Sequence, residues 1–370
     1  MRGKTSAARW SVVTLLAVAA LVAVGCEPQA QKGLKTAELL VALPDYCNTP
    51  DGMSLQPDGS FILSMPNFND EKSPPVMMRI TADNKAEKWY DLPDCPGAPD
   101  NLKRIRPMGV SRAPDGNLYL ADMQYMIDKN GKSRLWKIVV KDGKPEKMVL
   151  VAQGLNVANG TAVRDGYVYI TESDLDVGSV PLTSGVLRFK LDEENVTLKT
   201  PLKDDPHVIA AFKATMPNAK KWAFGADGIA FDSKGNLFIG QFGEGIIYKL
   251  VLGKDGKADV VLSNKVFAQG SGMINCDGMA CDPRTDKLYV SDSANNAIQI
   301  VSPDGKIQAL AINGPVTDKK SGLLCQPCES MLRGNTIIAS NMDWPFPDFK
   351  NEKIGHKQPA TLSVIKLDKP

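Results

Sequence analysis

Histidine is almost absent from this chain of 370 residues, which contains only His207 and His356. A Ser-His-Asp triad requires a histidine beside its nucleophile, and a histidine dyad requires two histidines together. The sequence therefore disfavours both mechanisms. It also has no Gly-x-Ser-x-Gly elbow, phosphate-binding loop or dinucleotide fingerprint in a context that would support one.

Net charge is also nearly absent. The chain has 44 Lys and Arg residues against 42 Asp and Glu residues, and three of the basic residues lie within the first nine positions. No long basic or acidic run occurs. Because binding to nucleic acid requires a basic face, we expect no nucleic acid partner.

Charged side chains are missing from an apolar stretch at residues 10–24, which follows the basic residues Arg2, Lys4 and Arg9. This arrangement is typical of a secretory signal peptide rather than of a membrane-spanning helix. We therefore predict a signal peptide at residues 1–25, and we expect the mature protein to be exported.

The signal peptide ends in Ala23-Val24-Gly25-Cys26, which resembles a bacterial lipobox with Ala23 at the position that is usually Leu. The resemblance implies lipidation of Cys26, a polar tether at residues 26–36 and a membrane-anchored lipoprotein facing the periplasm of a bacterial cell envelope. Plain secretion with Cys26 unmodified is the alternative.

Six further cysteines remain after Cys26, namely Cys47, Cys95, Cys276, Cys281, Cys325 and Cys328. An even number in an exported protein favours structural disulfides. The Cys325-Gln-Pro-Cys328 motif also resembles a redox or metal-binding pair. It has no following His for haem attachment and no second such pair for zinc, so we favour disulfides.

A short unit occurs six times in the chain. Each copy contains an apolar strand, a tight turn and a second strand that ends in a polar residue, and the copies begin 50 to 68 residues apart, as propeller blades do. The strands are rich in β-branched and aromatic residues. The copies occupy residues 51–64, 108–122, 159–172, 227–241, 277–292 and, in degenerate form, 329–341.

Third and fourth strands follow several units, as at residues 133–139 and 147–151. Four strands in six units predict an all-β, six-bladed β-propeller over residues 37–370. The last unit lacks a fourth strand, whereas an unassigned strand at residues 37–43 precedes the first unit. We predict that this N-terminal strand completes the last blade. The long gap at residues 191–224 is expected to contain a short helix at residues 207–216.

Rotational symmetry brings equivalent positions of the units to one central channel. The first residues of the six units are Asp51, Met108, Asn159, Asp227, Asp277 and Glu329. Carboxylates confined together repel one another, and a hard cation relieves that repulsion. Oxygen ligands without His or Cys indicate Ca²⁺, or another divalent cation, over zinc or copper. The alternative is that each Asp-Gly or Asn-Gly is only a turn former.

With these motifs, the mature chain resembles the senescence marker protein and gluconolactonase group, which includes regucalcin, lactonases and phosphotriesterases similar to diisopropyl-fluorophosphatase. The resemblance implies a six-bladed propeller with a divalent cation, usually calcium, at the channel mouth. It implies metal ligands at Asp51, Asn159 and Asp227, the last of which would also act as base. Asp277 is a further candidate metal ligand, because it occupies the equivalent position of the fifth unit. Met108 stands where the group has an Asn.

The resulting hypothesis is metal-assisted hydrolysis of a small-molecule lactone or ester. The cation would polarise the carbonyl, and Asp227 would act as general base toward water. Arg106 and Glu329 are candidate substrate-binding residues, although Arg106 could also be a solvated loop charge. Whether the protein is an enzyme stays open at this point.

A non-catalytic propeller is the alternative function. Residues 277–301 also resemble an NHL repeat, which is typical of platforms that bind a ligand or a protein partner. The aromatic, proline-rich segment 341–349 could line a ligand mouth, mark a partner surface or pack on the last blade. Convergence of the acidic residues on an ion would favour the hydrolase, whereas a mouth closed by apolar side chains would favour binding.

Overall fold

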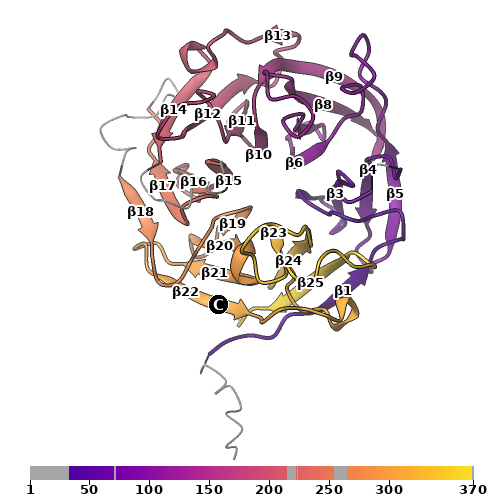
Figure 1. Cartoon of the computed structure of the whole chain (residues 1–370), viewed down its shortest axis with the longest axis vertical. Helices are drawn as coiled ribbons and strands as arrows, with labels where there is room; N and C mark the ends of the chain where they lie inside the picture. The colour runs from indigo at the N-terminus through magenta and orange to yellow at the C-terminus, as the bar shows by residue number, and fades with distance from the viewer. Residues whose placement is uncertain (1–32, 71, 215–221, 223, 254–264, 369–370) are drawn as a thin grey trace, which may run out of the picture. The chain divides into compact units, whose positions relative to one another are not determined.

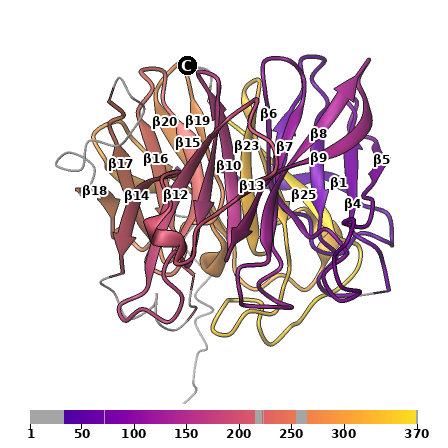
Figure 2. The ribbon, with the colours of Figure 1, turned by 90° about the horizontal axis from the view of Figure 1, so that it is seen from above.

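The repeated strand pairs fold into six antiparallel sheets arranged around a central channel (Figure 1). The computed structural model describes residues 33–70, 72–214, 222, 224–253 and 265–368. In the first five sheets the strands follow chain order from the channel outward, and Figure 2 shows the sheets from the side, with loops at both faces. The prediction of a six-bladed, four-stranded β-propeller is confirmed.

The six blades share one plan, in which four strands pair antiparallel with their neighbours. The first blade consists of β2 (Met53–Leu55), β3 (Phe61–Met65), β4 (Val76–Ile80) and β5 (Ala86–Asp91). The second consists of β6 (Pro107–Arg112), β7 (Leu118–Asp122), β8 (Ser133–Lys141) and β9 (Lys144–Leu155). The third consists of β10 (Ala158–Arg164), β11 (Tyr167–Glu172), β12 (Thr183–Lys190) and β14 (Val208–Lys213). The fourth blade consists of β15 (Ala226–Phe231), β16 (Leu237–Gln241), β17 (Ile246–Leu250) and β18 (Val266–Gln269). The fifth consists of β19 (Met279–Asp282), β20 (Lys287–Asp292), β21 (Ala297–Val301) and β22 (Ile307–Ile312). The sixth consists of β23 (Pro327–Arg333), β24 (Thr336–Asn341), β25 (Thr361–Lys366) and β1 (Glu38–Ala42).

The N-terminal strand β1 closes the ring. It pairs antiparallel with β25, with Glu38 opposite Val364 and Ala42 opposite Thr361. The last blade therefore contains strands from both ends of the chain, as predicted. This closure satisfies the backbone edge that β25 would otherwise leave unpaired.

The gap between the third and fourth units differs from the prediction. Residues 208–213 form β14, the outermost strand of the third blade, and not a helix. The β-branched pair Val208 and Ile209 favours a strand, and the buried side chains of Ile209 and Phe212 pack against the same blade core. Residues 215 and 216 of the predicted helix lie outside the described residues. A short strand, β13 (Val196–Thr197), adds a parallel fifth strand to the second blade at β9.

The hydrophobic core lies between neighbouring blades rather than in one central mass. Leu120 and Trp136 of the second blade pack with Ile62 and Met77 of the first. The same arrangement recurs at the other interfaces, where alternate residues of each sheet face the next sheet. The channel is therefore left to the side chains of the innermost strands.

The N-terminal predictions fall mostly outside the described residues. The predicted signal peptide, Cys26 and the first part of the tether belong to residues 1–32. The end of the tether is described, and the backbone N–H of Lys35 donates to the carbonyl of Leu310 in β22 at 2.7 Å. Among the helices of the described part, none has both the length and the apolar character needed to cross a membrane.

Candidate functional site

The first residues of the repeat units meet around the channel. Asp51, Asn159, Asp227 and Asp277 each line two cavities, which open from opposite ends of the channel. They therefore form the partition between those cavities. Rotational symmetry predicted this convergence, and the structure brings the four side chains together.

The glycine after each of these residues explains why the blades meet so closely. A Cβ atom added at any of them, or at Gly109 after Met108, would lie 2.0–2.6 Å from the nearest atom of the next blade. For four of these glycines the nearest atom is a backbone carbonyl oxygen: Met108 for Gly52, Asn159 for Gly109, Asp227 for Gly160 and Asp277 for Gly228. For Gly278 it is the side-chain atom Glu329 Oε1. None of these glycines has a positive φ angle. The interpretation of the X-Gly pairs as turn formers is therefore wrong, because they permit close approach of neighbouring blades.

Hydrogen bonds orient three of the four partition residues. Asn159 Nδ2 donates to Asp227 Oδ2 at 2.7 Å, and the Ser293 hydroxyl donates to Asp277 Oδ2 at 2.7 Å. Asp51 is 5% exposed, and its Oδ2 is buried without a hydrogen-bond partner. Asp51 therefore carries an unsatisfied acceptor at the centre of the molecule, which is costly unless a proton or a cation compensates it.

The acidic side chains perturb one another. Burial raises the pKa of Asp51 to about 7. Burial also raises the pKa of Asp227 well above its usual range, and repulsion from Asp277, then from Asp51 and Glu329, adds to the shift. The pKa values of Asp277 and Glu329 are raised in the same way, by burial first. None of the four acids forms an ion pair within the described residues, so each favours its protonated form or a bound cation.

A second set of buried polar side chains holds the partition residues in place. These side chains stand at the end of the second strand of a blade and accept backbone N–H groups of the segment that leads into the innermost strand. Asp122 accepts from Arg106 N at 2.8 Å, and Glu172 accepts from Asn156 N at 2.8 Å and from Val157 N at 2.6 Å. In the same way Asp292 accepts from Asn275 N at 3.3 Å, and Asn341 accepts from Cys325 N at 2.9 Å. Their role is to position the backbone, and the polar residue that ends each repeat was the signal for it.

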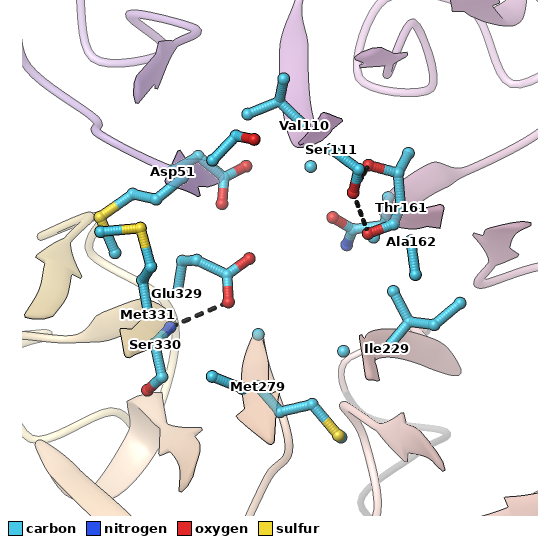
Figure 3. A pocket seen from close by; sticks show the side chains of 18 of the residues that line it. Asp51, Val110, Ser111, Thr161, Ala162, Ile229, Met279, Glu329, Ser330 and Met331 are labelled. Carbon is cyan, nitrogen blue, oxygen red and sulfur yellow. Dashed lines mark hydrogen bonds between the residues drawn. The ribbon is translucent and has the colours of Figure 1, made fainter. Parts of the chain in front are cut away.

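One end of the channel opens into a polar cavity of about 360 Å³, lined by the innermost strands. Figure 3 shows it with the carboxylates of Asp51 and Glu329 pointing into the channel and Ser111 hydrogen-bonded to Thr161. The two hydroxyl oxygens lie 3.0 Å apart. This cavity can therefore hold water and polar groups beneath the partition.

The other end opens into a smaller pocket of about 40 Å³, which we call the aromatic pocket. Besides the four partition residues it is lined by Met108, Met123, Met126, Phe224, Phe242, Gln326, Met342, Trp344 and Phe346. Of the aromatic segment 341–349, Trp344 and Phe346 line this mouth, whereas Phe349 packs in a core cluster with Trp222 and Phe242. Sequence reasoning missed the contributions of Phe224, Phe242, Met123 and Met126.

The two predicted substrate-binding residues differ in position. Glu329 faces the polar cavity, where Ser330 N donates to its Oε1 at 2.9 Å. Arg106 lines neither cavity among the described residues, and its backbone is held between β6 and β7 by Asp122 and Met123. A role for Arg106 in substrate binding stays a prediction. His207 and His356 lie elsewhere, beside Asp205 and Asp343 respectively.

The predicted disulfides do not form in the structure. All six cysteines from Cys47 to Cys328 are free thiols. Cys325 and Cys328 have separate surroundings: Cys325 Sγ lies 2.7 Å from Lys319 Nζ, whereas Cys328 Sγ lies 3.0 Å from the carbonyl oxygen of Pro50. Cys47, Cys276 and Cys328 are buried in three different hydrophobic clusters, so the even number of cysteines in the sequence did not indicate pairing.

The donor set suits a hard cation in its chemistry. Three carboxylates and one amide converge, and one carboxylate oxygen has no partner. In the described part of the chain, however, no group of three or more His, Cys, Asp or Glu side chains is arranged to hold a metal ion. Binding a cation at the partition would therefore require these side chains to move from the positions that they occupy.

Comparison with known proteins identifies relatives by fold only. No family model and no curated protein matches the sequence. Among solved structures, the chain is similar to a gluconolactonase from Xanthomonas campestris, at 12% identity and a TM-score of 0.53, over 91% of this chain and 92% of that one. It is also similar to the calcium-binding protein regucalcin from Agrobacterium tumefaciens, at 12% identity and a TM-score of 0.54, over 90% and 96%.

A neighbour of different chemistry has the same degree of similarity. The aldose sugar dehydrogenase from Streptomyces coelicolor, solved with PQQ, matches at 13% identity and a TM-score of 0.54, over 90% of this chain and 98% of that one. At these identities the likeness establishes the propeller fold and not a reaction. The function must be argued from the residues of the channel.

Proposed function

We propose that this protein is a divalent-cation-dependent hydrolase of lactones or esters, with its site at the partition of the channel. The observation that carries the proposal is the convergence of Asp51, Asn159, Asp227 and Asp277 without a basic partner among the described residues. The fold similarity to a gluconolactonase and to regucalcin supports the same direction. Calcium is the cation that these hard oxygen donors favour.

The chain's own residues supply the acid–base chemistry and the orientation. Asp227 would accept a proton from water as general base, and the amide of Asn159 holds one oxygen of its carboxylate in place. Asp51 and Asp277 would complete the oxygen donors. A bound cation would polarise the substrate carbonyl and stabilise the oxyanion that develops on it.

Glu329 is better placed to join the acidic cluster than to contact the substrate. Its carboxylate points into the channel beside Asp51 (Figure 3), on the polar side of the partition. A substrate that enters by the aromatic pocket would meet the partition residues first. Glu329 would then hold water or support the cation from below.

The test compares Asp227→Asn with Asp165→Asn, the same change in an exposed turn. Asp165 has a φ of 50°, which Asn tolerates. Calcium binding is measured by calorimetry after chelation, and hydrolysis is measured on a panel of lactones and aryl esters. We expect chelation to abolish hydrolysis, calcium to restore it, and Asp227→Asn to lower the rate by about 10²–10⁴-fold. A wild-type protein that binds no divalent cation, or an Asp227→Asn variant of full activity, would contradict the proposal.

A binding platform is the second candidate function. The apolar lining and small volume of the aromatic pocket favour it, because bulky substrates have little room above the partition. Ligand binding by the wild-type protein with no hydrolysis across the panel, with or without calcium, would favour this function.

We also propose export and lipid anchoring through Cys26 in a bacterial cell envelope, on the strength of the apolar stretch and the lipobox-like end. A lipid on Cys26 would be the membrane attachment of the propeller. We expect the full chain to fractionate with membranes and Cys26→Ser to abolish lipidation, as measured by the mass of the N-terminal peptide. Membrane attachment that is unchanged in Cys26→Ser would contradict the anchor.

A further inference from the structure

Four aromatic side chains in the wall of the aromatic pocket contact one another in a row. We define the aromatic collar as Phe224, Phe242, Trp344 and Phe346, of which the first two come from loops of the fourth blade and the last two from a loop of the sixth. Trp344 meets Phe346 edge-on with ring centres 5.2 Å apart, and Phe224 meets Phe242 edge-on at 5.9 Å. Phe242 and Phe346 join the two pairs at 6.0 Å. These contacts hold the rings in place before any ligand arrives.

The collar extends outward on both sides. Phe68 stacks on Trp344 at 5.0 Å, and Tyr125 meets Phe224 edge-on at 6.0 Å. Lys129 Nζ lies 5.1 Å from the ring centre of Tyr125, so one ring at the rim already carries a cation on its face. The side chains of Met108, Met123, Met126 and Met342 also line the pocket.

The floor of the same pocket is acidic. Asp51, Asp227 and Asp277 line it, and no Lys, Arg or His is among the described residues of its lining. Asp51 is 5% exposed, and its Oδ2 has no hydrogen-bond partner. At this floor an anionic ligand would meet like charges, whereas a positive group would meet carboxylates below it and aromatic side chains beside it.

We infer that the aromatic pocket binds a compact organic cation, such as a methylated ammonium group, with its charge toward the Asp51 carboxylate and its methyl groups against the collar. Aromatic collars recognise such groups because the ring faces are negative and the methyl groups are apolar. The volume of about 40 Å³ limits the headgroup, since one water needs about 10–15 Å³ on this scale. A larger apolar tail would extend outward past the half-exposed side chain of Met126.

As a statement about substrates, the inference rests on the proposed function: the hydrolase would act on an ester whose alcohol or acyl part carries the cation. As a statement about binding, it stands without hydrolysis. Calcium would draw on the same carboxylates, so the two cations are expected to influence each other's affinity.

The test titrates choline and its uncharged carbon isostere, 3,3-dimethylbutan-1-ol, into the mature protein, both calcium-free and calcium-loaded. The two ligands have the same shape, so their difference in affinity measures the charge. We expect choline to bind about tenfold or more tightly than the alcohol in the calcium-free protein. Equal affinities, or no binding of choline in either state, would overturn the inference.

Two variants locate the site. Trp344→Leu removes one ring of the collar, and Trp89→Leu removes a partly exposed ring of β5 far from the channel mouth as the matched control. We expect the first to weaken choline binding about tenfold and the second to leave it unchanged. Thermal unfolding checks that both variants fold, and Phe346→Leu replaces Trp344→Leu if the latter does not. Equal affinities of the collar variant and the wild type would overturn the location.

The outcomes separate the two proposals. Choline binding without hydrolysis of any ester would reject the hydrolase and keep the cation site. Calcium-dependent hydrolysis of neutral lactones, with choline neither binding nor inhibiting, would keep the hydrolase and reject the cation site.

Discussion

Glu172 shows how single buried carboxylates build this channel. It ends β11 and accepts backbone N–H groups of Asn156, Val157 and Asp174. These bonds hold the segment that leads to Asn159 in the partition. Burial nevertheless raises the pKa of Glu172 to about 8, because the side chain has lost its contact with water.

The raised pKa makes stability depend on pH. A carboxyl group with a pKa near 4.5 when unfolded and about 8 when folded binds more protons in the folded state between those values. Its contribution to stability is therefore complete below pH 4.5 and is lost as the pH rises toward 8, by about 1.4 kcal/mol for each pH unit. Glu172→Gln should flatten this part of the curve of unfolding free energy against pH. Below pH 4.5 it should also lower stability by about 1 kcal/mol, because one backbone N–H loses its acceptor. Urea unfolding at several pH values measures both effects, and an unchanged slope would contradict the prediction.

Lys319 and Asp343 form a second buried polar centre, and neither residue lines the two cavities of the channel. Their side chains are 6% and 4% exposed and form an ion pair, with Cys325 Sγ in contact with both. Removal of one charge would leave the other buried without its partner.

We therefore expect Lys319→Met to lower the free energy of unfolding by about 3–5 kcal/mol. Lys320→Met is the matched control, because the neighbouring Lys320 is exposed, and its effect should stay within about 0.5 kcal/mol. Urea denaturation of the two variants measures the difference. Equal stability of the two would show that the buried pair contributes little.

At the scale of the element, close contact between neighbouring blades fixes the positions of the innermost strands. The glycines of the X-Gly pairs let each innermost strand contact the carbonyl of the next. Ser111 and Thr171 add hydrogen bonds across the same interfaces, to the carbonyls of Thr161 and Asp227 at 2.6 and 2.7 Å. The width of the channel therefore follows from these contacts.

Gly160→Ala tests this role. A Cβ at Gly160 would lie 2.4 Å from the carbonyl oxygen of Asp227, so the third and fourth blades must move apart. We expect a loss of about 1–3 kcal/mol, as for other overpacked sites, together with weaker cation binding at the partition. Gly314→Ala is the control, since a Cβ there meets no atom within 4 Å. Thermal unfolding compares the two, and equal midpoints would contradict the close-approach explanation.

At the scale of the whole molecule, stability depends on closure of the ring. β1 supplies the outermost strand of the last blade, with buried Ala37 and Leu43 at its two ends. Without β1, the edge of β25 would be exposed to other chains. Blades packed side by side would still share their cores, but the last blade would lack its outer layer.

A chain that begins at residue 44 should therefore lose about 3 kcal/mol or more of stability and aggregate through the free edge of β25. A chain that begins at Gly33 keeps β1 and is the matched control. Thermal unfolding and light scattering measure both effects. Equal stability of the two chains would mean that β1 contributes nothing to closure.

The sequence by itself determined the repeat, the number of blades and the convergence of Asp51, Asn159, Asp227 and Asp277. These features depend on local strand patterns and on rotational symmetry, both of which a linear sequence carries. The closing strand at residues 38–42 was predictable for the same reason, because one blade lacked a strand and one strand lacked a blade.

Only the tertiary structure decided what distant segments do when they meet. Phe224, Phe242, Trp344 and Phe346 come together in the aromatic pocket because loops of different blades share one face of the ring. The X-Gly glycines proved to be inter-blade contacts and the cysteines free thiols. The inter-blade contacts join atoms more than 40 residues apart in the chain, and no local pattern in the sequence records that they meet.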